Sequence, residues 1–255
     1  MIQTAIKPSA RTKSPSLARS FDVYYRDADR TERMDKLNTQ FIRPGGLAFD
    51  IGAHIGDRTG SFLRLGATVV VVEPQPHVFR ALRLLYGNVP DATLLCKAVG
   101  AAPGTLDLFV NSDNPTITTA SASLISAAST SAQWQGQVWD QEISVPVTTL
   151  DQLIAQYGVP DFVKIDVEGF EAEVIKGLSQ PLQMLSFEFT TIQRDVALDC
   201  LSWLGSLAKY KFNLSLGEQH ALEQENWVDA CAMRNQITSL PSKANSGDIF
   251  ARIRR

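Results

Sequence analysis

Four acidic residues stand at or just beyond the ends of short apolar segments in this 255-residue chain: Asp50, Glu73, Asp166 and Glu188. Near-continuous apolar runs of this length are typical of parallel strands that are buried on both faces. The carboxyl ends of such strands meet at one rim of an open sheet, and ligands bind there. We therefore expect the four carboxylates to lie together at a binding or catalytic site.

The first of these segments, LAFDIGAHIGD, runs from a strand into a glycine turn. A dinucleotide site needs the spacing GxGxxG, with the pyrophosphate on the N-terminus of the following helix. Here Gly52 and Gly56 are spaced GxxxG, and Asp50 would repel a phosphate. S-adenosylmethionine has no phosphate; its ammonium and sulfonium suit Asp50, and its carboxylate suits helix-end N–H groups. Glu73, at the end of the next strand, can accept both ribose hydroxyls, although NAD enzymes use an acid at a similar spacing.

Strand-like and helix-like segments alternate along most of the chain, which predicts an α/β fold with an open, doubly wound sheet in one domain. A lead-in helix is expected at about residues 30–42, and a lid-like or mobile insertion without clear periodicity at about 111–142. The last strand is expected to be antiparallel, at or near an edge. The strand-like segments are LAFDI, TVVVV, TLLCKAV, TLDLFV, DFVKID, QMLSFEF, KFNLSL and DIFARI.

Composition limits the other classes of protein. Residues 1–20 are basic without any acid and are expected to be a disordered tail, which leaves residues 21–255 as a single, acidic domain. An acidic domain is a poor binder of nucleic acid. No apolar run reaches the length of a membrane span, so no membrane partner is expected. The three cysteines are odd in number and have no CxxC spacing, which indicates no zinc site and favours the cytoplasm.

Five blocks, in order, resemble the FkbM-type S-adenosylmethionine-dependent methyltransferases: FDIGAHIGDRT, VVVVEPQP, KAVG, VTTLDQL and DFVKIDVEGFEAEVIKGL. The resemblance covers about Phe41 to Phe189. It implies a Rossmann-like class I methyltransferase fold with a mostly parallel, seven-stranded sheet and one antiparallel strand near the edge. It also implies S-adenosylmethionine as the cofactor and methyl transfer, typically to a hydroxyl oxygen.

The same resemblance implies roles for individual residues. The methionine end of the cofactor would be lined by Asp50, Gly52, Ala53, His54 and Gly56, and its carboxylate would meet Thr59. The ribose would be held by Glu73 and Pro74, the adenine flanked by Ala98 and Val99, and the sulfonium underlain by Asp166. The family often has Asn where His54 and Lys97 stand. His54 can still donate and accept hydrogen bonds, whereas Lys97 cannot accept one.

The candidate catalytic residues are Asp166, Glu168 and Glu188. Glu188 is open to three interpretations: a base, a metal ligand or a buried partner of Lys164. Glu171, at the start of a helix, is interpreted as structural because acids there favour the helix dipole. A divalent metal at Asp166 and Glu188 is possible but not favoured, since two acids make an incomplete ligand set.

The methyl acceptor is predicted from an absence of positive charge. Residues 98–163 contain no Lys or Arg, yet they bring acids, hydroxyls, Trp134 and Trp139. Phosphorylated acceptors are normally held by Arg or Lys, so we expect a hydroxyl on a neutral or weakly cationic small molecule or glycan. Two alternative functions stay open: an NAD-dependent oxidoreductase, and a non-catalytic module that binds S-adenosylmethionine. The sequence does not predict the oligomeric state.

Overall fold

The computed structural model describes residues 15–253, and within them two β-sheets. The larger sheet has seven strands in the order β3-β2-β1-β7-β8-β10-β9. Its members are β1 (Leu47–Ile51), β2 (Thr68–Val72), β3 (Ala92–Leu95), β7 (Phe162–Ile165), β8 (Met184–Thr190), β9 (Tyr210–Leu216) and β10 (Ser246–Ile253). The smaller sheet, in the order β4-β6-β5, contains β4 (Ala98–Val99), β5 (Gly104–Val110) and β6 (Gln141–Thr148).

The larger sheet is mostly parallel with one antiparallel strand near its edge, as predicted. β3, β2, β1, β7 and β8 are parallel, and β10 lies antiparallel between β8 and β9. The strand order reverses between β1 and β7, so the carboxyl ends of these two strands form the switch point where ligands bind in such sheets. The predicted class I methyltransferase fold, with one antiparallel strand beside the edge, is confirmed.

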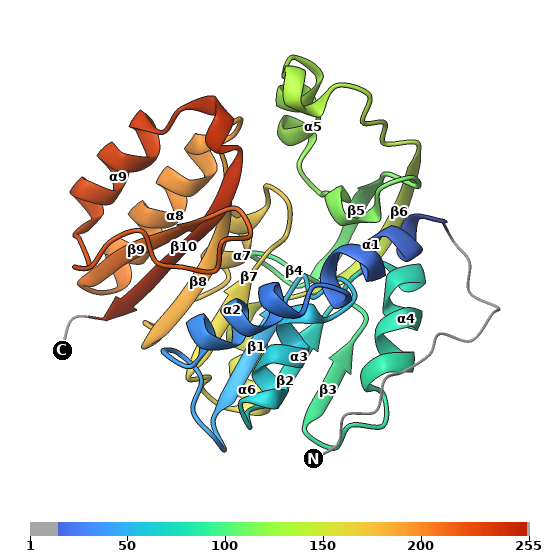
Figure 1. The fold of residues 1–255 in the computed structure, drawn as a ribbon, viewed down its shortest axis with the longest axis horizontal. Helices are drawn as coiled ribbons and strands as arrows, with labels where there is room; N and C mark the ends of the chain where they lie inside the picture. The colour runs from blue at the N-terminus through green and yellow to red at the C-terminus, as the bar shows by residue number, and fades with distance from the viewer. Residues whose placement is uncertain (1–14, 254–255) are drawn as a thin grey trace.

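Helices cover both faces of the larger sheet, as Figure 1 shows. One face packs against α2 (Ala28–Asn38), α3 (Asp57–Arg64) and α4 (Pro76–Tyr86). The other packs against α6 (Leu150–Tyr157), α7 (Glu171–Lys176), α8 (Arg194–Leu207) and α9 (Ala230–Ser239). None of the helices between residues 15 and 253 is long and apolar enough to cross a membrane.

The alternation of side chains along β1 explains the two layers. Phe49 and Ile51 lie in the core under α6 to α9, while Ala48 lies in the core under α2 to α4. Successive residues of a strand point to opposite faces, so both sets must be apolar in a strand that is covered on both sides. Asp50, on the same face as Ala48, is the polar exception and begins the site.

The smaller sheet was not anticipated as a separate unit. The segment TLLCKAV was expected to be one strand, but the chain leaves the larger sheet after Leu95, and Ala98 and Val99 pair with β6 instead. β5, expected beside the other strands, pairs antiparallel with β6. The two sheets therefore meet at residues 96–97, and the smaller sheet forms a wall beside the carboxyl ends of β1 and β2.

The N-terminal prediction needs a correction. Residues 15–20 were assigned to a disordered tail, but α1 (Pro15–Tyr25) begins there; residues 1–14 lie outside the described part. Leu17 is buried against Ile55 and Val78, and this apolar contact orders the helix. The lead-in helix, expected at about 30–42, is α2 and ends at Asn38, whose side chain donates to Ser61.

The insertion at 111–142 is structured and tied to the site. It contains the 3₁₀ helix η1 (Pro115–Ile117), α5 (Ala122–Ser129) and the 3₁₀ helix η2 (Ala132–Trp134), and its last two residues begin β6. Thr118 donates to the side-chain oxygen of Gln75 at 2.9 Å, and Thr119 donates to the carbonyl of Glu168 at 2.6 Å. These bonds join the insertion to the ends of β2 and β7.

The aromatic cluster of Phe41, Phe62, Phe162 and Phe250 should contribute much of the free energy of unfolding. Phe162 is 1% exposed and stacks on Phe41 with ring centroids 5.2 Å apart. We expect Phe162→Ala to lower the free energy of unfolding by about 3–5 kcal/mol, because the change leaves a cavity. Leu84→Ala, at a 76% exposed position of α4, should change it by no more than about 0.5 kcal/mol. Urea unfolding followed by circular dichroism measures both, and equal effects would contradict this packing.

Candidate active site

The turn after β1 approaches β7 so closely that only glycine fits. Gly52 has φ +80°, and a Cβ there would clash with the carbonyl oxygen of Asp166. The N–H groups of Gly52 and Ala53 both donate to the carbonyl of Val72, at 2.9 and 3.0 Å. The turn is therefore held between the ends of β2 and β7, at the switch point.

Asp50 is buried two residues before Gly52 and is hydrogen-bonded to α3. It is 1% exposed, and the Thr59 hydroxyl donates to its Oδ2 at 2.5 Å. Burial raises the pKa of Asp50 to about 6, although the Thr59 hydroxyl lowers it in part. Thr59 is fully buried behind Asp50 and lines neither of the cavities described below. Gly56 also lies outside them; its φ of +82° begins α3.

Glu73, at the end of β2, has both carboxylate oxygens bonded to backbone amides. Oε2 accepts from the N–H of His54 at 2.9 Å, and Oε1 accepts from the N–H of Gln75 at 2.8 Å. Glu73 is 2% exposed, and burial raises its pKa to about 7 against the lowering effect of the two amides. Each oxygen keeps a lone pair for a further donor, as a ribose contact requires.

His54 is held in a left-handed conformation, with φ 50°, by contacts on both sides. Its Nε2 lies 2.9 Å from the Ser20 hydroxyl of α1, and its ring packs edge-on against Tyr24. Its Nδ1 is buried and has no partner among the described residues. Burial lowers the pKa of His54 to about 4, so the ring is neutral at pH 7 and one ring nitrogen can accept a hydrogen bond.

Three carboxylates gather at the ends of β7 and β8. Oxygen atoms of Asp166, Glu168 and Glu188 all lie within 4.8 Å of one another. Burial, and then the neighbouring acids, raise the pKa of Glu168 and of Glu188 well above the ordinary value. The described residues thus include an acid cluster that could share a proton or hold a cation.

Lys164 neutralises part of this cluster. Its ammonium is 3.0 Å from Asp166 Oδ2 and 2.6 Å from Asp248 Oδ1, and its side chain is 3% exposed. Burial alone would lower the pKa of Lys164, but the two carboxylates raise it above its ordinary value. Among the described residues, Asp166 and Asp248 form the ion pairs with Lys164, while Glu188 acts on it from farther away and adds to the rise of its pKa.

Glu171 is bonded to the loop that precedes α7. It is 2% exposed, and its Oε1 accepts from the N–H groups of Val167 and Gly169 at 3.1 and 3.2 Å. These bonds fix the loop between β7 and α7. Glu168 lies within that loop with φ 56°, a conformation that is uncommon outside glycine. Glu171 thus sets the position of Glu168 without facing the cavities.

Two adjoining cavities open above the switch point. The smaller, of about 60 Å³, is bounded by the ends of β1 and β2 and by the smaller sheet. The larger, of about 240 Å³, extends over β7 and β8 toward α1 and the insertion. Both are lined by Gly52, His54, Thr116, Asp166 and Glu168. The acid cluster therefore stands where the two cavities meet.

Most of the predicted site residues line these cavities. The smaller is also lined by Glu73, Pro74, Ala98 and Val99, and the larger by Asp50, Ala53 and Glu188. The sequence missed Gln75, Leu106 and Leu108 in the smaller cavity and Tyr24, Arg58 and Thr190 in the larger. Gln75 and Arg58 lie within the quoted blocks VVVVEPQP and FDIGAHIGDRT, so their place in these motifs was a signal, but no site role was assigned to them. Leu106 and Leu108 lie in β5 and Tyr24 in α1, two elements that the sequence did not connect with the site; Thr190 ends β8.

A family model matches residues 50–237, described as a methyltransferase FkbM domain. The chain belongs to the FkbM methyltransferase family. Its members transfer a methyl group from S-adenosylmethionine, so the chain is an S-adenosylmethionine-dependent methyltransferase. The alternative of an NAD-dependent oxidoreductase is thereby set aside. A search of curated proteins found no match.

Solved structures that resemble the chain include three methyltransferases. A TehB-like S-adenosylmethionine-dependent methyltransferase from Corynebacterium glutamicum has 10% identity and a TM-score of 0.47, covering 94% of this chain and 96% of that one. An O-methyltransferase from Bacillus cereus, in complex with S-adenosylhomocysteine, has 14% identity and a TM-score of 0.44, over 94% and 87%. The precorrin-6y C5,15-methyltransferase of Geobacter metallireducens has 12% identity and a TM-score of 0.44, over 88% and 87%.

The site fits the cofactor on its own chemistry. Gly52 lines both cavities without a side chain, and the buried Nδ1 of His54 has an unused hydrogen-bonding position. Glu73 offers carboxylate oxygens at the edge of the smaller cavity, whose far side is lined by Ala98, Val99 and other apolar groups. We expect the adenosine in this cavity, with its ribose at Glu73, and the methionine part in the larger one.

The pKa of Glu73 makes cofactor binding dependent on pH. An ionised carboxylate accepts two hydroxyl hydrogen bonds better than a protonated one, so affinity for S-adenosylhomocysteine should rise as the pH increases through about 7. We expect Glu73→Gln to weaken binding by about 1.5–3 kcal/mol at pH 8 and to remove this dependence. Calorimetry at pH 6, 7 and 8 measures both effects. The control Glu142→Gln changes an exposed acid of β6 and should behave as the parent; an unaltered Glu73→Gln titration would refute the ribose assignment.

Proposed function

We propose that the protein methylates a hydroxyl oxygen of a small molecule or glycan, and that a glutamate of the acid cluster takes the hydroxyl proton. The observation that carries this proposal is the position of Asp166, Glu168 and Glu188 at the junction of the two cavities. S-adenosylmethionine supplies an activated methyl group. The protein then has to align the acceptor oxygen with that methyl and to remove one proton.

The electrostatics of the cluster suit a general base. A carboxylate of ordinary pKa is a weak base at neutral pH, and a raised pKa makes it stronger. Burial and the neighbouring acids raise the pKa of Glu168 and of Glu188, while the Lys164 ammonium keeps Asp166 compensated. One of the two glutamates can therefore hold a proton while the other receives one. We assign Asp166 to the sulfonium side because it lines both cavities and, unlike the two glutamates, forms an ion pair with Lys164.

The lining of the larger cavity supports an acceptor without phosphate. Besides the acid cluster it offers Tyr24, Trp134, Thr190 and Ser246, which are groups that pack against and hydrogen-bond a polyol. Trp139 donates its indole N–H to the carbonyl of Ile117 and does not line either cavity. Of the two tryptophans we therefore propose Trp134 for acceptor contact.

Three further expectations remain part of the proposal. Nucleic acid is not the acceptor, because the insertion over the site carries acids and no basic residue. A divalent metal is not needed, although the acid cluster has the ligand types to hold one. A reducing, cytoplasmic setting is proposed because Cys96, Cys200 and Cys231 are all free thiols.

The base can be identified by single substitutions. We expect either Glu168→Gln or Glu188→Gln to lower kcat about 10²–10⁴-fold, the usual contribution of a general base, and to remove the fall of kcat toward low pH. Both variants should still bind S-adenosylhomocysteine, since neither glutamate is assigned to it. Transfer of a labelled methyl group to a panel of alcohols measures kcat.

Glu171→Gln is the matched control for this experiment. It should retain the acid limb of the kcat profile and lose about 1–3 kcal/mol of stability, because two loop amides lose a charged acceptor. EDTA should leave the parent rate unchanged. If both glutamate variants kept the parent kcat, the carboxylate base would be disproved. Cofactor binding without methyl transfer to any acceptor would instead favour the non-catalytic module.

The class of acceptor can be tested with matched pairs. We expect neutral glycosides to be methylated with a higher kcat/KM than their phosphate esters, because a phosphate would enter an acid-lined cavity. Trp134→Ala should raise KM for the glycoside about tenfold, an effect on the scale of a lost aromatic contact, whereas Trp139→Ala should not. A clear preference for the phosphorylated compound would overturn this acceptor class.

A further inference from the structure

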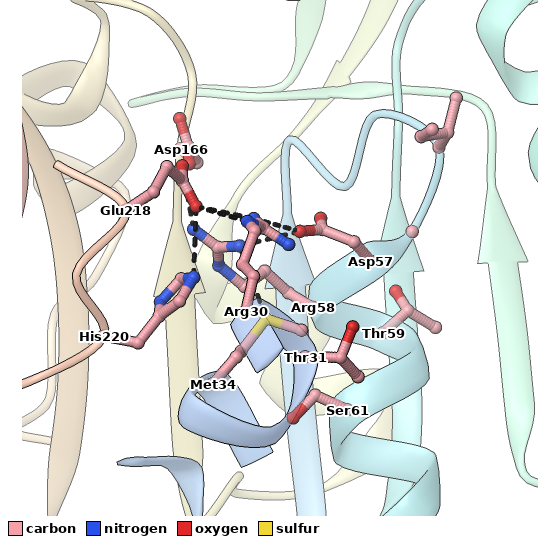
Figure 2. A network of polar contacts seen from close by, with 12 residues as sticks. Arg30, Thr31, Met34, Asp57, Arg58, Thr59, Ser61, Asp166, Glu218 and His220 are labelled. Carbon is pink, nitrogen blue, oxygen red and sulfur yellow. Dashed lines mark hydrogen bonds and ion pairs between the residues drawn. The ribbon is translucent and has the colours of Figure 1, made fainter. Parts of the chain in front are cut away.

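A network of charges joins three elements at the edge of the larger cavity (Figure 2). Arg30 of α2 and Arg58 of α3 share the carboxylate of Asp57, at 2.8 and 2.7 Å. The carboxylate of Glu218, in the loop after β9, is 2.6 Å from Arg30 Nη2, and His220 Nε2 is 3.1 Å from it. The network fastens α2, α3 and this loop together.

The two arginines take different positions in the network. Arg30 is 4% exposed and does not line either cavity; its Nε and Nη2 are both bonded to Glu218. Arg58 lines the larger cavity directly beyond the glycine turn. Its Nη1 reaches Asp57 at 2.7 Å and the Met34 sulfur at 3.4 Å. Arg30 thus holds the network together, while Arg58 also lines the larger cavity.

Among the described residues, Arg58 makes hydrogen bonds through Nη1 alone. A guanidinium has five N–H donors in a planar fork. The Nη2 of Arg58 is 3.6 Å from Glu218, an ion-pair contact but longer than a hydrogen bond. Burial would lower the pKa of Arg58, but Asp57 and Glu218 raise it well above its ordinary value, so the group stays charged. A cation with free donors at a cavity wall is suited to a carboxylate.

The charges that line the larger cavity limit which group of a ligand can bind beside Arg58. Among the described residues of this lining, Arg58 is the one Arg or Lys; Asp57 and Glu218 flank it, and Asp166, Glu168 and Glu188 form the separate acid cluster. The methionine part of the cofactor is a zwitterion whose ammonium and sulfonium suit the acids and whose carboxylate needs a cation. The N-terminus of α3 is capped by Gly56 and so has no side chain that bonds its first amides. The positive end of the helix dipole therefore lies beside Arg58.

We propose that Arg58 binds the methionine carboxylate of S-adenosylmethionine, in place of the role first expected of Thr59. Asp57 and Glu218 orient the guanidinium, and Arg30 fixes those two acids from behind. Arg58 then distinguishes the amino-acid end of the cofactor from plain adenosines. The inference rests on the cofactor and not on the identity of the acceptor.

Two ligands that differ in the amino-acid part test this assignment by binding alone. S-adenosylhomocysteine carries the carboxylate, and 5′-methylthioadenosine has the same adenosine and sulfur without it. We expect Arg58→Ala to raise the Kd of S-adenosylhomocysteine about 10–100-fold, as for a lost hydrogen bond between charged groups, and to leave that of 5′-methylthioadenosine within about twofold. Calorimetry on the full chain measures both, and no turnover is needed.

Arg30→Ala is the matched control, because it breaks the same network without removing a cavity group. It should change the Kd of the two ligands by the same factor. If Arg58→Ala weakened both ligands equally, or neither, the proposal would be overturned. Should Arg58→Ala fail to fold, Arg58→Lys and decarboxylated S-adenosylhomocysteine serve instead. The parent should then prefer the carboxylate ligand at least about tenfold, and the lysine variant should lose part of that preference.

Discussion

The buried ammonium of Lys164 is the charge on which the acidic rim depends. β8 lies between β7 and β10, so the contact from Lys164 to Asp248 spans a whole strand. Ser186 stands opposite Lys164 in the ladder, and its small side chain leaves room for this passage. Without the ammonium, Asp166 and the two glutamates would face one another in a site of low polarity. The ion pair therefore holds together the strands and the charges that make the site.

The sequence predicted the part of the molecule that local rules determine. Near-continuous apolar runs, broken by turns, identify strands that are buried on both faces, and the acid at the end of a run marks its carboxyl end. Asp50, Glu73, Asp166 and Glu188 were placed correctly at one rim for that reason. The antiparallel final strand was also anticipated, because DIFARI alternates as a less buried strand does. The lining of both cavities includes most of the residues that the family resemblance implied.

The remaining features depend on contacts between distant segments. Residues 92–99 contain no turn residue, yet pairing with β6 draws Ala98 and Val99 into a second sheet. Thr59 has the right type and position for a ligand, but the buried Asp50 needs its hydroxyl. The Arg58 guanidinium contacts Asp57, its neighbour in sequence, and Glu218, which is distant in sequence. The direction of the Arg58 side chain therefore depends on how α2 and the loop at Glu218 pack, and the sequence alone does not give it. Which of several partners a polar side chain bonds depends on tertiary contacts, and a single sequence does not reveal them.

The first helix gives the site a consequence for kinetics. α1 lies across the glycine turn, with Ser20 bonded to His54 and the hydroxyl of Tyr25 donating to the carbonyl of Ile55 at 2.8 Å. It also contacts η1, whose Thr116 and Ile117 line the larger cavity. Its buried apolar contact is small, centred on Leu17, so its undocking requires far less free energy than global unfolding. We therefore expect the larger cavity, which Tyr24 of α1 lines, to open when these eleven residues undock, although they lie far in sequence from every cofactor motif.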